Sequence, residues 1–264
     1  MQLGRFGDII NILPVVRYIS DNFAKPTMMV AEEFGSILEG VSYCDRHVVP
    51  LHYSKLHDAI ALANAGYTKV LVTQVWGHDY CQEKRCKSFS EESWRMANML
   101  HLYDDPTMLP RFDLRDYYRE SVLVDSAMSQ YEDSKLPIIA VCLHGGMSSP
   151  FGHASLFLEM IKAETNGKAH IVNLSAIKAH RLYDLLAIFE HSDLLVTIDT
   201  AIHHLAAATS IPTIVLHGQE AWIAAKPRCN LIAQFGYGDA AANPAAVMDC
   251  IAEALKTISN VEAT

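Results

Sequence analysis

The chain has 264 residues, of which 50% are hydrophobic and 19% are charged. This supply of apolar residues excludes a disordered chain, a coiled coil and a collagen-like repeat. The formal net charge of -9 argues against a general nucleic-acid binder, which needs a basic surface. The sequence shows neither an apolar run of the roughly 18 residues that a membrane span needs nor a secretory signal pattern. We therefore expect a cytoplasmic protein with reduced cysteines and at most peripheral membrane contact.

The first half of the chain has a mixed pattern. Its periodicity predicts helices at 9–19 and 56–65 and strands at 26–31, 41–50 and 69–75. Residues 77–119 are rich in charged and aromatic side chains and show no clean period, which is typical of a set of functional loops. The polar stretch 131–135 predicts a linker, so we expect one domain at 1–133 and a second at 134–264.

The second half alternates between strand and helix patterns. Apolar runs predict strands at 137–143, 169–174, 193–198 and 211–216. Helical periods predict helices at 155–164, 179–190, 200–208 and 243–258. Strands that are apolar on both faces and alternate with helices favour a parallel sheet covered on both sides, so we expect the α/β class.

The most informative segment is residues 196–208, Val-Thr-Ile-Asp-Thr-Ala-Ile-His-His-Leu-Ala-Ala-Ala. Asp199 follows an apolar strand and stands at the expected N-cap of a helix of small residues. The start of that helix offers backbone N–H groups to a phosphate, and Thr200 and His204 share one face of it. Ala201 would let a ligand approach closely. An ordinary strand-to-helix junction, with Asp199 as a cap and two surface histidines, accounts for the same residues equally well.

Three other loops carry candidate site residues. Asp8 ends the segment Arg-Phe-Gly-Asp at 5–8, where Gly7 permits a tight turn, and it either caps a helix or acts as a general base. Residues 144–150, His-Gly-Gly-Met-Ser-Ser-Pro, follow a strand, and their glycines and hydroxyls fit anion binding as well as a flexible loop. Gln219 and Glu220 follow the last predicted strand, in a loop that faces the ligand crevice of such a sheet.

One cluster of metal-ligating residue types lies in the first half. His78, Cys81 and Cys86 are close in sequence, but the second ligand pair of a zinc site is missing. Free thiols are the favoured interpretation, and we expect no metal site.

Together these segments resemble glycosyltransferase family 9, the heptosyltransferase-like enzymes. Residues 5–14 are similar to the family's Arg-x-Gly-Asp motif with its following proline. Residues 193–208 are similar to its Asp-Thr-Gly-x-x-His-Leu-Ala-Ala segment, and 144–150 to its His-Pro-Gly loop. The resemblance implies the GT-B fold, in which two Rossmann-like domains with parallel sheets face a central cleft. Because only three residues precede Gly4, either the chain starts further upstream or the first domain lacks its first strand.

The resemblance also implies an activity. It is metal-independent inverting transfer of a heptose-like sugar from a nucleotide-diphosphate donor, with an ADP-sugar favoured, to an acceptor hydroxyl. The implied acceptor is a glycan or glycolipid, as in lipopolysaccharide biosynthesis, and no cofactor is implied. Asp8 matches the catalytic base. The implied donor site comprises Asp199, Thr200, Ala201 and His204, with Ser148 and Ser149 on an adjacent loop and Gln219 and Glu220 as further candidates.

Several departures from the family pattern keep alternatives open. No lysine follows the 144–150 loop, Ala201 stands where the family has glycine, and no acidic residue follows the second strand near 173–175. One alternative is a non-catalytic nucleotide-sugar-binding protein of the same fold. Another is an epimerase-like or phosphatase-like enzyme, which would turn over nucleotide sugars without an acceptor.

Overall fold

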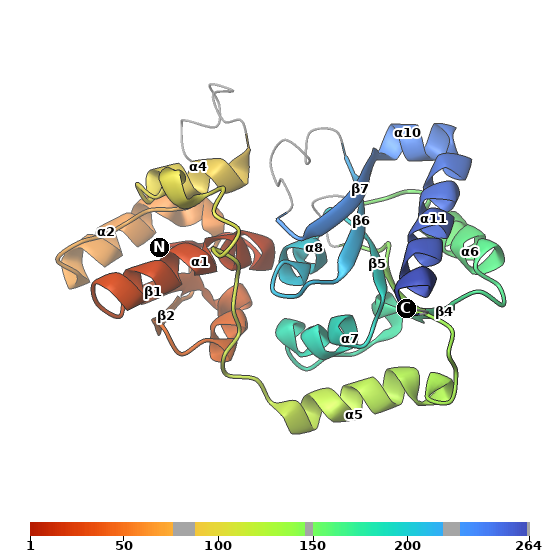
Figure 1. Ribbon diagram of the computed structural model, residues 1–264. Coiled ribbons are helices and arrows are strands. Elements are labelled where there is room, and N and C mark those ends of the chain that lie inside the picture. The colour runs from red at the N-terminus through yellow and green to blue at the C-terminus, as the bar shows by residue number, and fades with distance from the viewer. Residues whose placement is uncertain (76–87, 146–149, 219–227, 263–264) are drawn as a thin grey trace. The chain divides into compact units, whose positions relative to one another are not determined.

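The computed structural model describes residues 1–75, 88–145, 150–218 and 228–262. The described residues fall into two compact units, one that ends at Arg115 and one that begins at Asp116 (Figure 1). Both units contain helices and parallel strands, which confirms the α/β class expected from the sequence.

The first unit is built on two parallel strands. It begins with α1 (Phe6–Asn22), β1 (Thr27–Ala31), the 3-10 helix η1 (Glu32–Gly40) and β2 (Asp45–Val49). The remaining elements are η2 (Tyr53–Lys55), α2 (Leu56–Gly66), α4 (Phe89–Met96) and η3 (Leu100–Leu102). Side chains from both strands and from α2 pack around one buried cluster, which comprises Leu3, Met29, Val49, Ala59 and Ala63.

The first three residues lie where a strand beside β1 would lie. The Gln2 N–H donates to the Met29 carbonyl at 3.0 Å, and the Thr73 N–H donates to the Met1 carbonyl at 3.0 Å. The Leu3 N–H donates to Oε1 of Gln74 at 2.8 Å. Residues 1–3 therefore lie between β1 and residues 71–74, and they supply the hydrogen bonds of the strand that the sequence left in doubt. The strand predicted at 69–75 is not a regular strand, because part of its hydrogen bonding to residues 1–3 uses the side chains of Gln2 and Gln74.

The second unit contains a five-stranded parallel sheet in the order β4-β3-β5-β6-β7. Its strands are β3 (Ile138–Cys142), β4 (His170–Asn173), β5 (Leu194–Ile198), β6 (Pro212–His217) and β7 (Asn230–Gly236). The first four confirm the predicted strands. Strand β7 is not predicted from the sequence, because its side chains are half-buried or exposed and it lacks a continuous apolar run.

Helices cover both faces of this sheet (Figure 1). On one face Val196 packs in a common core with Phe157 of α6 (Ala154–Glu164) and Ile251 of α11 (Pro244–Glu262). The opposite face carries α7 (Leu186–Glu190) and α8 (Ala201–Ala206). The helical elements are α5 (Tyr117–Met128), η4 (Ser129–Tyr131), α6 (Ala154–Glu164), η5 (Leu174–Ala176), η6 (Leu182–Leu185), α7 (Leu186–Glu190), α8 (Ala201–Ala206), α10 (Tyr237–Ala242) and α11 (Pro244–Glu262).

A buried carboxylate joins α5 to the second unit. Asp184 is fully buried and accepts bonds from the Arg181 backbone N–H at 3.0 Å and from the Arg181 guanidinium at 2.9 and 3.1 Å. Arg119 of α5 brings its Nε to 3.9 Å from the same carboxylate. Helix α5 therefore packs with the second unit, although it precedes the 133/134 boundary that the polar stretch predicts. The helix predicted at 179–190 starts only at Leu182. Its N-cap is Arg181, whose backbone N–H donates to the Asp184 carboxylate as in a capping box.

Candidate functional site

Two of the predicted loops start at neighbouring strand ends. Strands β3 and β5 are parallel neighbours, with Cys142 opposite Thr197 near their carboxyl ends. The chain passes from β3 to β4 on one side and returns to β5 on the other, so the strand order reverses between β3 and β5. Ligands of doubly wound sheets bind at the carboxyl edge where the order reverses. Asp199 begins one loop at that edge, and His144 lies on the other.

Thr200, and not Asp199, caps helix α8. The Asp199 N–H still donates to the Leu216 carbonyl at 2.9 Å, which keeps Asp199 in the sheet. The Thr200 hydroxyl accepts the N–H of Ile202 at 3.2 Å and also that of His203. The prediction of Asp199 as the N-cap is therefore wrong by one residue. Two of the amides expected to be open to phosphate already have the Thr200 hydroxyl as a partner, and Ala201 contributes the first helical amide.

His203 is the second residue that caps the start of helix α8. Its ring is fully buried, and Nδ1 accepts the Thr200 N–H at 3.1 Å. An Nδ1 that accepts a hydrogen bond carries no proton, so in the neutral ring the proton is on Nε2. The expectation of a surface position for this histidine is therefore wrong. The available signal was its position three residues after the Thr200 cap, where a capping-box partner stands.

His204 lies half-buried next to His203, with 3.9 Å between the two ring centroids. Burial, with a smaller contribution from the neighbouring His203, lowers the pKa of His204 well below its ordinary value. The imidazole is therefore neutral at neutral pH. It can donate a hydrogen bond to an anion, but it does not bring the positive charge that a charge-assisted bond requires.

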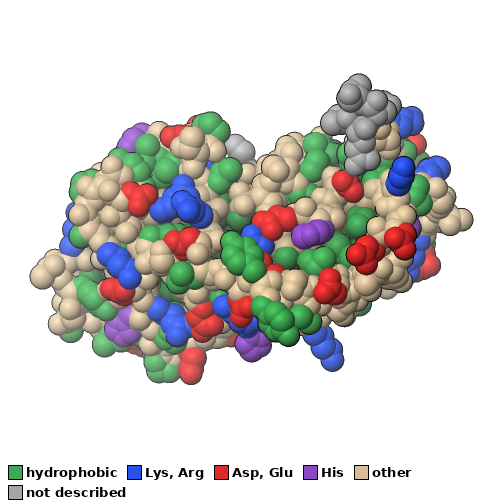
Figure 2. Space-filling view, turned by 60° about the horizontal axis from the view of Figure 1, so that its bottom comes forward, with side chains coloured by type: hydrophobic (Ala, Val, Ile, Leu, Met, Phe, Trp, Pro, Cys, Tyr) green, Lys and Arg blue, Asp and Glu red, His purple; other side chains and the backbone are tan. Residues whose placement is uncertain are grey.

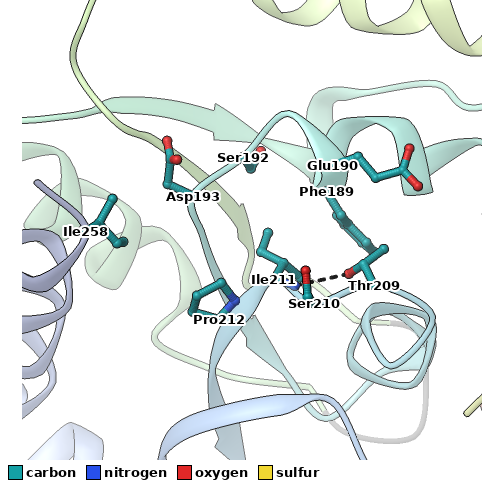
Figure 3. A pocket seen from close by; sticks show the side chains of 9 residues that line it. All are labelled: Phe189, Glu190, Ser192, Asp193, Thr209, Ser210, Ile211, Pro212 and Ile258. Carbon is teal, nitrogen blue, oxygen red and sulfur yellow. Dashed lines mark hydrogen bonds between the residues drawn. The ribbon is translucent and has the colours of Figure 1, made fainter. Parts of the chain in front are cut away.

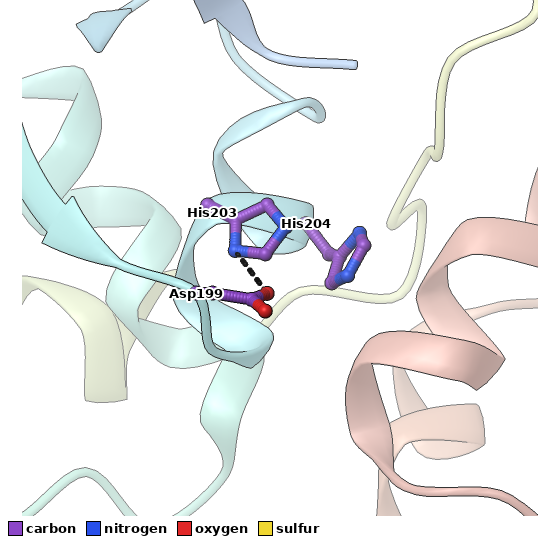
Figure 4. A group of neighbouring side chains, drawn as sticks. All are labelled: Asp199, His203 and His204. Atoms are coloured by element: carbon purple, nitrogen blue, oxygen red, sulfur yellow. Dashed lines mark ion pairs between the residues drawn. The ribbon is translucent and has the colours of Figure 1, made fainter. Parts of the chain in front are cut away.

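These two rings and one carboxylate form a compact group (Figure 4). Oδ1 of Asp199 lies 3.7 Å from Nδ1 of His203. Asp199, His203 and His204 each offer a ligand atom, and all three atoms lie within 4.8 Å of one another. Within the described residues, these three side chains form the group that could hold a metal ion.

Other predicted donor-site residues can be placed only in part. Ala201 and Thr200 lie at the start of α8, as expected. Ser148, Ser149, Gln219 and Glu220 lie outside the described residues. His217, at the end of β6, is buried, and burial lowers its pKa.

Asp8 in the first unit lies in the first turn of α1. Its Oδ2 accepts the backbone N–H of Arg5 at 2.9 Å, so the capping role is confirmed. Burial raises the pKa of Asp8 to about 6, against a smaller opposing effect from the Arg5 N–H and the Arg5 charge. A carboxylate with a pKa near 6 is ionised at neutral pH and still accepts a proton readily, which suits a general base.

The glycine that this carboxylate requires is Gly4. A Cβ on Gly4 would lie 2.5 Å from Oδ2 of Asp8 and 2.8 Å from Oε1 of Gln2, which is closer than atoms can approach. Gly7, which the sequence analysis assigned to a tight turn, lies inside α1 instead. The structural requirement therefore falls three residues earlier than predicted.

A separate hollow of about 430 Å³ opens near the amino ends of β5 and β6 (Figure 3). Glu190 and Asp193 are among its lining residues, and Oδ2 of Asp193 accepts the Ile138 N–H at 2.7 Å. Two carboxylates would repel a diphosphate, and this hollow lies at the opposite end of the strands from Asp199. It does not fit the predicted donor site.

On the face shown in Figure 2, basic and acidic side chains are interspersed, and the described residues there form no continuous basic area. No helix of the described residues combines the length and hydropathy that crossing a membrane requires.

The fold is that of known sugar-transferring enzymes. A glycosyltransferase family 9 protein from Veillonella parvula matches with a TM-score of 0.60 and 11% identity, over 97% of this chain and 94% of that one. The E. coli ADP-heptose lps heptosyltransferase II matches at 0.56 and 12%, over 97% and 98%. The E. coli heptosyltransferase WaaC with ADP matches at 0.54 and 13%, over 96% and 100%. The expected GT-B architecture, with its parallel sheets, is the one these structures have.

One part of the chain also matches a family of sugar-transferring enzymes in sequence. Residues 140–256 match the model of glycosyltransferase family 9 (heptosyltransferase), and this segment contains the Asp199 loop and α8. This match agrees with the family resemblance found in the sequence. A comparison with curated proteins finds no match.

Proposed function

We propose that the protein is a metal-independent inverting glycosyltransferase that moves a heptose-like sugar from a nucleotide-diphosphate donor to an acceptor hydroxyl. The observation that carries this proposal is the position of Asp199, Thr200 and His204. They lie at the carboxyl edge where the strand order of the family 9 domain reverses. An ADP-linked donor is favoured, because similar folds include a heptosyltransferase with ADP and one with ADP-2-deoxy-2-fluoro heptose.

In the proposed reaction Asp8 is the base. The acceptor hydroxyl gives its proton to the Asp8 carboxylate while its oxygen forms a bond to the anomeric carbon of the donor. The bond between that carbon and the phosphate oxygen breaks on the opposite face, and the electron pair leaves with the nucleoside diphosphate. With a pKa of about 6, most Asp8 side chains are ionised at neutral pH and ready to accept this proton.

The departing diphosphate gains negative charge as the bond breaks. In the proposed donor site, the Thr200 hydroxyl, the Ala201 amide and the neutral His204 ring donate hydrogen bonds to it. Each such bond to a charged group stabilises by about 1.5–3 kcal/mol, more in a site closed to water. This set of donors would take the part that a metal ion plays in other glycosyltransferases. The acceptor we propose is a glycan or glycolipid, in line with the lps substrate named for one similar structure.

The proposal is tested by donor binding and turnover, measured separately. Thermal shifts with ADP-, GDP-, UDP- and CDP-sugars identify the donor, because a ligand at 100 times its Kd adds about 2.7 kcal/mol of stability. Release of nucleoside diphosphate is then followed with glycan and glycolipid acceptors. Asp8→Asn is expected to lower kcat by at least about 100-fold while the donor Kd stays unchanged. A fully active Asp8→Asn variant would show that the base is another group.

Donor binding has its own matched pair of variants. Thr200→Val removes a hydroxyl at the start of α8 and is expected to weaken donor binding by about tenfold or more. Thr209→Val removes a hydroxyl that donates to the Ala206 carbonyl near the other end of α8, and it is expected to leave donor binding unchanged. Tight donor binding without release of nucleoside diphosphate across the acceptor panel would instead favour the non-catalytic nucleotide-sugar-binding protein.

A further inference from the structure

We propose that Asp199, His203 and His204 form a binding site for a divalent transition-metal ion such as Zn²⁺. Within the ranges that the structure describes, they are the one group of at least three His, Cys, Asp or Glu side chains whose ligand atoms converge within 4.8 Å. The inference does not rest on the proposed function, since it is argued only from the positions of these three side chains.

The measured separations fit a zinc coordination sphere. Zinc binds imidazole nitrogen and carboxylate oxygen at about 2.0–2.2 Å. An ion at such distances from Asp199 Oδ1 and His203 Nδ1, which are 3.7 Å apart, would subtend an angle of about 120° between them. That angle is close to tetrahedral. One ring nitrogen of His204 lies within 4.8 Å of the ligand atoms of the other two residues, so it can supply the third ligand.

The ligand types select the ion. Two imidazoles and one carboxylate suit Zn²⁺, Co²⁺, Ni²⁺ and Cu²⁺, whereas Mg²⁺ and Ca²⁺ prefer oxygen ligands. The single carboxylate neutralises one of the ion's two positive charges. The ligands are largely buried, since the His203 side chain is 1% and the Asp199 side chain 11% exposed. Three protein ligands leave a fourth position for water.

Metal binding competes with the cap of α8. His203 Nδ1 uses its lone pair to accept the Thr200 N–H at 3.1 Å, and an ion at Nδ1 would use the same lone pair. The ion therefore releases the Thr200 amide from His203. If the proposed function holds, the ion occupies the place where Thr200 and His204 bind diphosphate, so it acts as an inhibitor of transfer.

The metal-ligand group requires a histidine at the position before His204. The family segment that this sequence resembles has one histidine, which matches His204, and leaves the preceding position open. This chain has His203 at that position. The second histidine both caps the helix and completes the metal-ligand group.

The test is a Co²⁺ titration of the metal-free full-length protein, followed by visible absorption. We expect one equivalent to give the d–d bands of a nitrogen and oxygen site, without the near-ultraviolet charge-transfer band of a thiolate site. His203→Gln is the decisive variant, because glutamine at this position keeps a capping-box acceptor for Thr200 but removes the imidazole. It is expected to weaken Co²⁺ binding by at least about tenfold. His180→Gln, an exposed position in the same unit, is the matched control and is expected to bind as the unchanged protein does.

Two further readouts separate loss of a ligand from loss of structure. Far-ultraviolet circular dichroism without metal shows whether each variant is folded, and His204→Gln, at a half-buried position, provides a second variant. In the amide NMR spectrum, Co²⁺ should shift or broaden the Thr200 signal in the unchanged protein and leave it unaffected in His203→Gln. Equal Co²⁺ binding by His203→Gln and the unchanged protein, or a thiolate band, would overturn the proposal. Donor binding and turnover are assayed with a chelator present, so they report on the proposed function separately.

Discussion

Asp8→Asn should stabilise the protein at neutral pH while it removes the proposed base. Burial raises the pKa of Asp8 from 3.8 to about 6, a shift of about two units. Each unit corresponds to about 1.4 kcal/mol, so the ionised carboxylate lowers the free energy of unfolding by about 3 kcal/mol. Asparagine cannot ionise, and its side-chain oxygen can still accept the Arg5 N–H that lies 2.9 Å from Oδ2.

The sign of the pH dependence follows from which state binds the proton more tightly. The folded protein holds the Asp8 proton up to about pH 6, and the unfolded chain loses it near 3.8. The stabilising contribution of the protonated carboxyl is therefore complete below about pH 4 and is lost as the pH rises through 6. We expect Asp8→Asn to match the unchanged protein near pH 4 and to exceed its stability by up to about 3 kcal/mol near pH 8.

Urea unfolding across this pH range, followed by circular dichroism, measures the difference. Asp21→Asn, an exposed position in the last turn of the same helix, is the control and should change stability by less than about 0.5 kcal/mol. If Asp8→Asn and the unchanged protein had equal stability near pH 8, or if a gain of the same size persisted near pH 4, burial of the Asp8 charge would not be the cause and the assignment would be refuted.

Three other substitutions test the local geometry. Gly4→Ala should lower kcat and reduce stability by about 1–3 kcal/mol, because the added methyl would overlap the carboxylate of the proposed base. The control Gly66→Ala, with no atom within 4 Å of the added Cβ, should be close to neutral in urea unfolding. Thr200→Ala should lower stability by about 1 kcal/mol through loss of the α8 cap, and Thr200→Ser should restore most of it in the same assay. Asp184→Ala should lower the free energy of unfolding by about 3–5 kcal/mol, because it leaves the Arg181 guanidinium without its carboxylate partner. The control Glu159→Ala, in an exposed ion pair, should lower it by less than about 1 kcal/mol.

Local sequence patterns were sufficient for most of the second unit. The runs that became the interior strands β3, β5 and β6 are apolar on both faces, and this pattern occurs because a parallel sheet is buried on both sides. The same patterns identified the loop of Asp199 and the helix that follows it, because a strand end, a capping residue and a run of small residues are adjacent in the chain. Strand β7 lacks that signal, because its side chains are exposed or half-buried and none is fully buried.

The sequence by itself determined the α/β class, the residue types of the site and the family resemblance, because each of these is encoded in segments of about ten to fifteen neighbouring residues. Tertiary structure alone decided the rest. It assigned the helix cap to Thr200, buried His203 against it, and set Gly4 against the Asp8 carboxylate. These outcomes depend on how the strand ends, the helix starts and the burial of each side chain meet in space, and no spacing along the chain reports those distances.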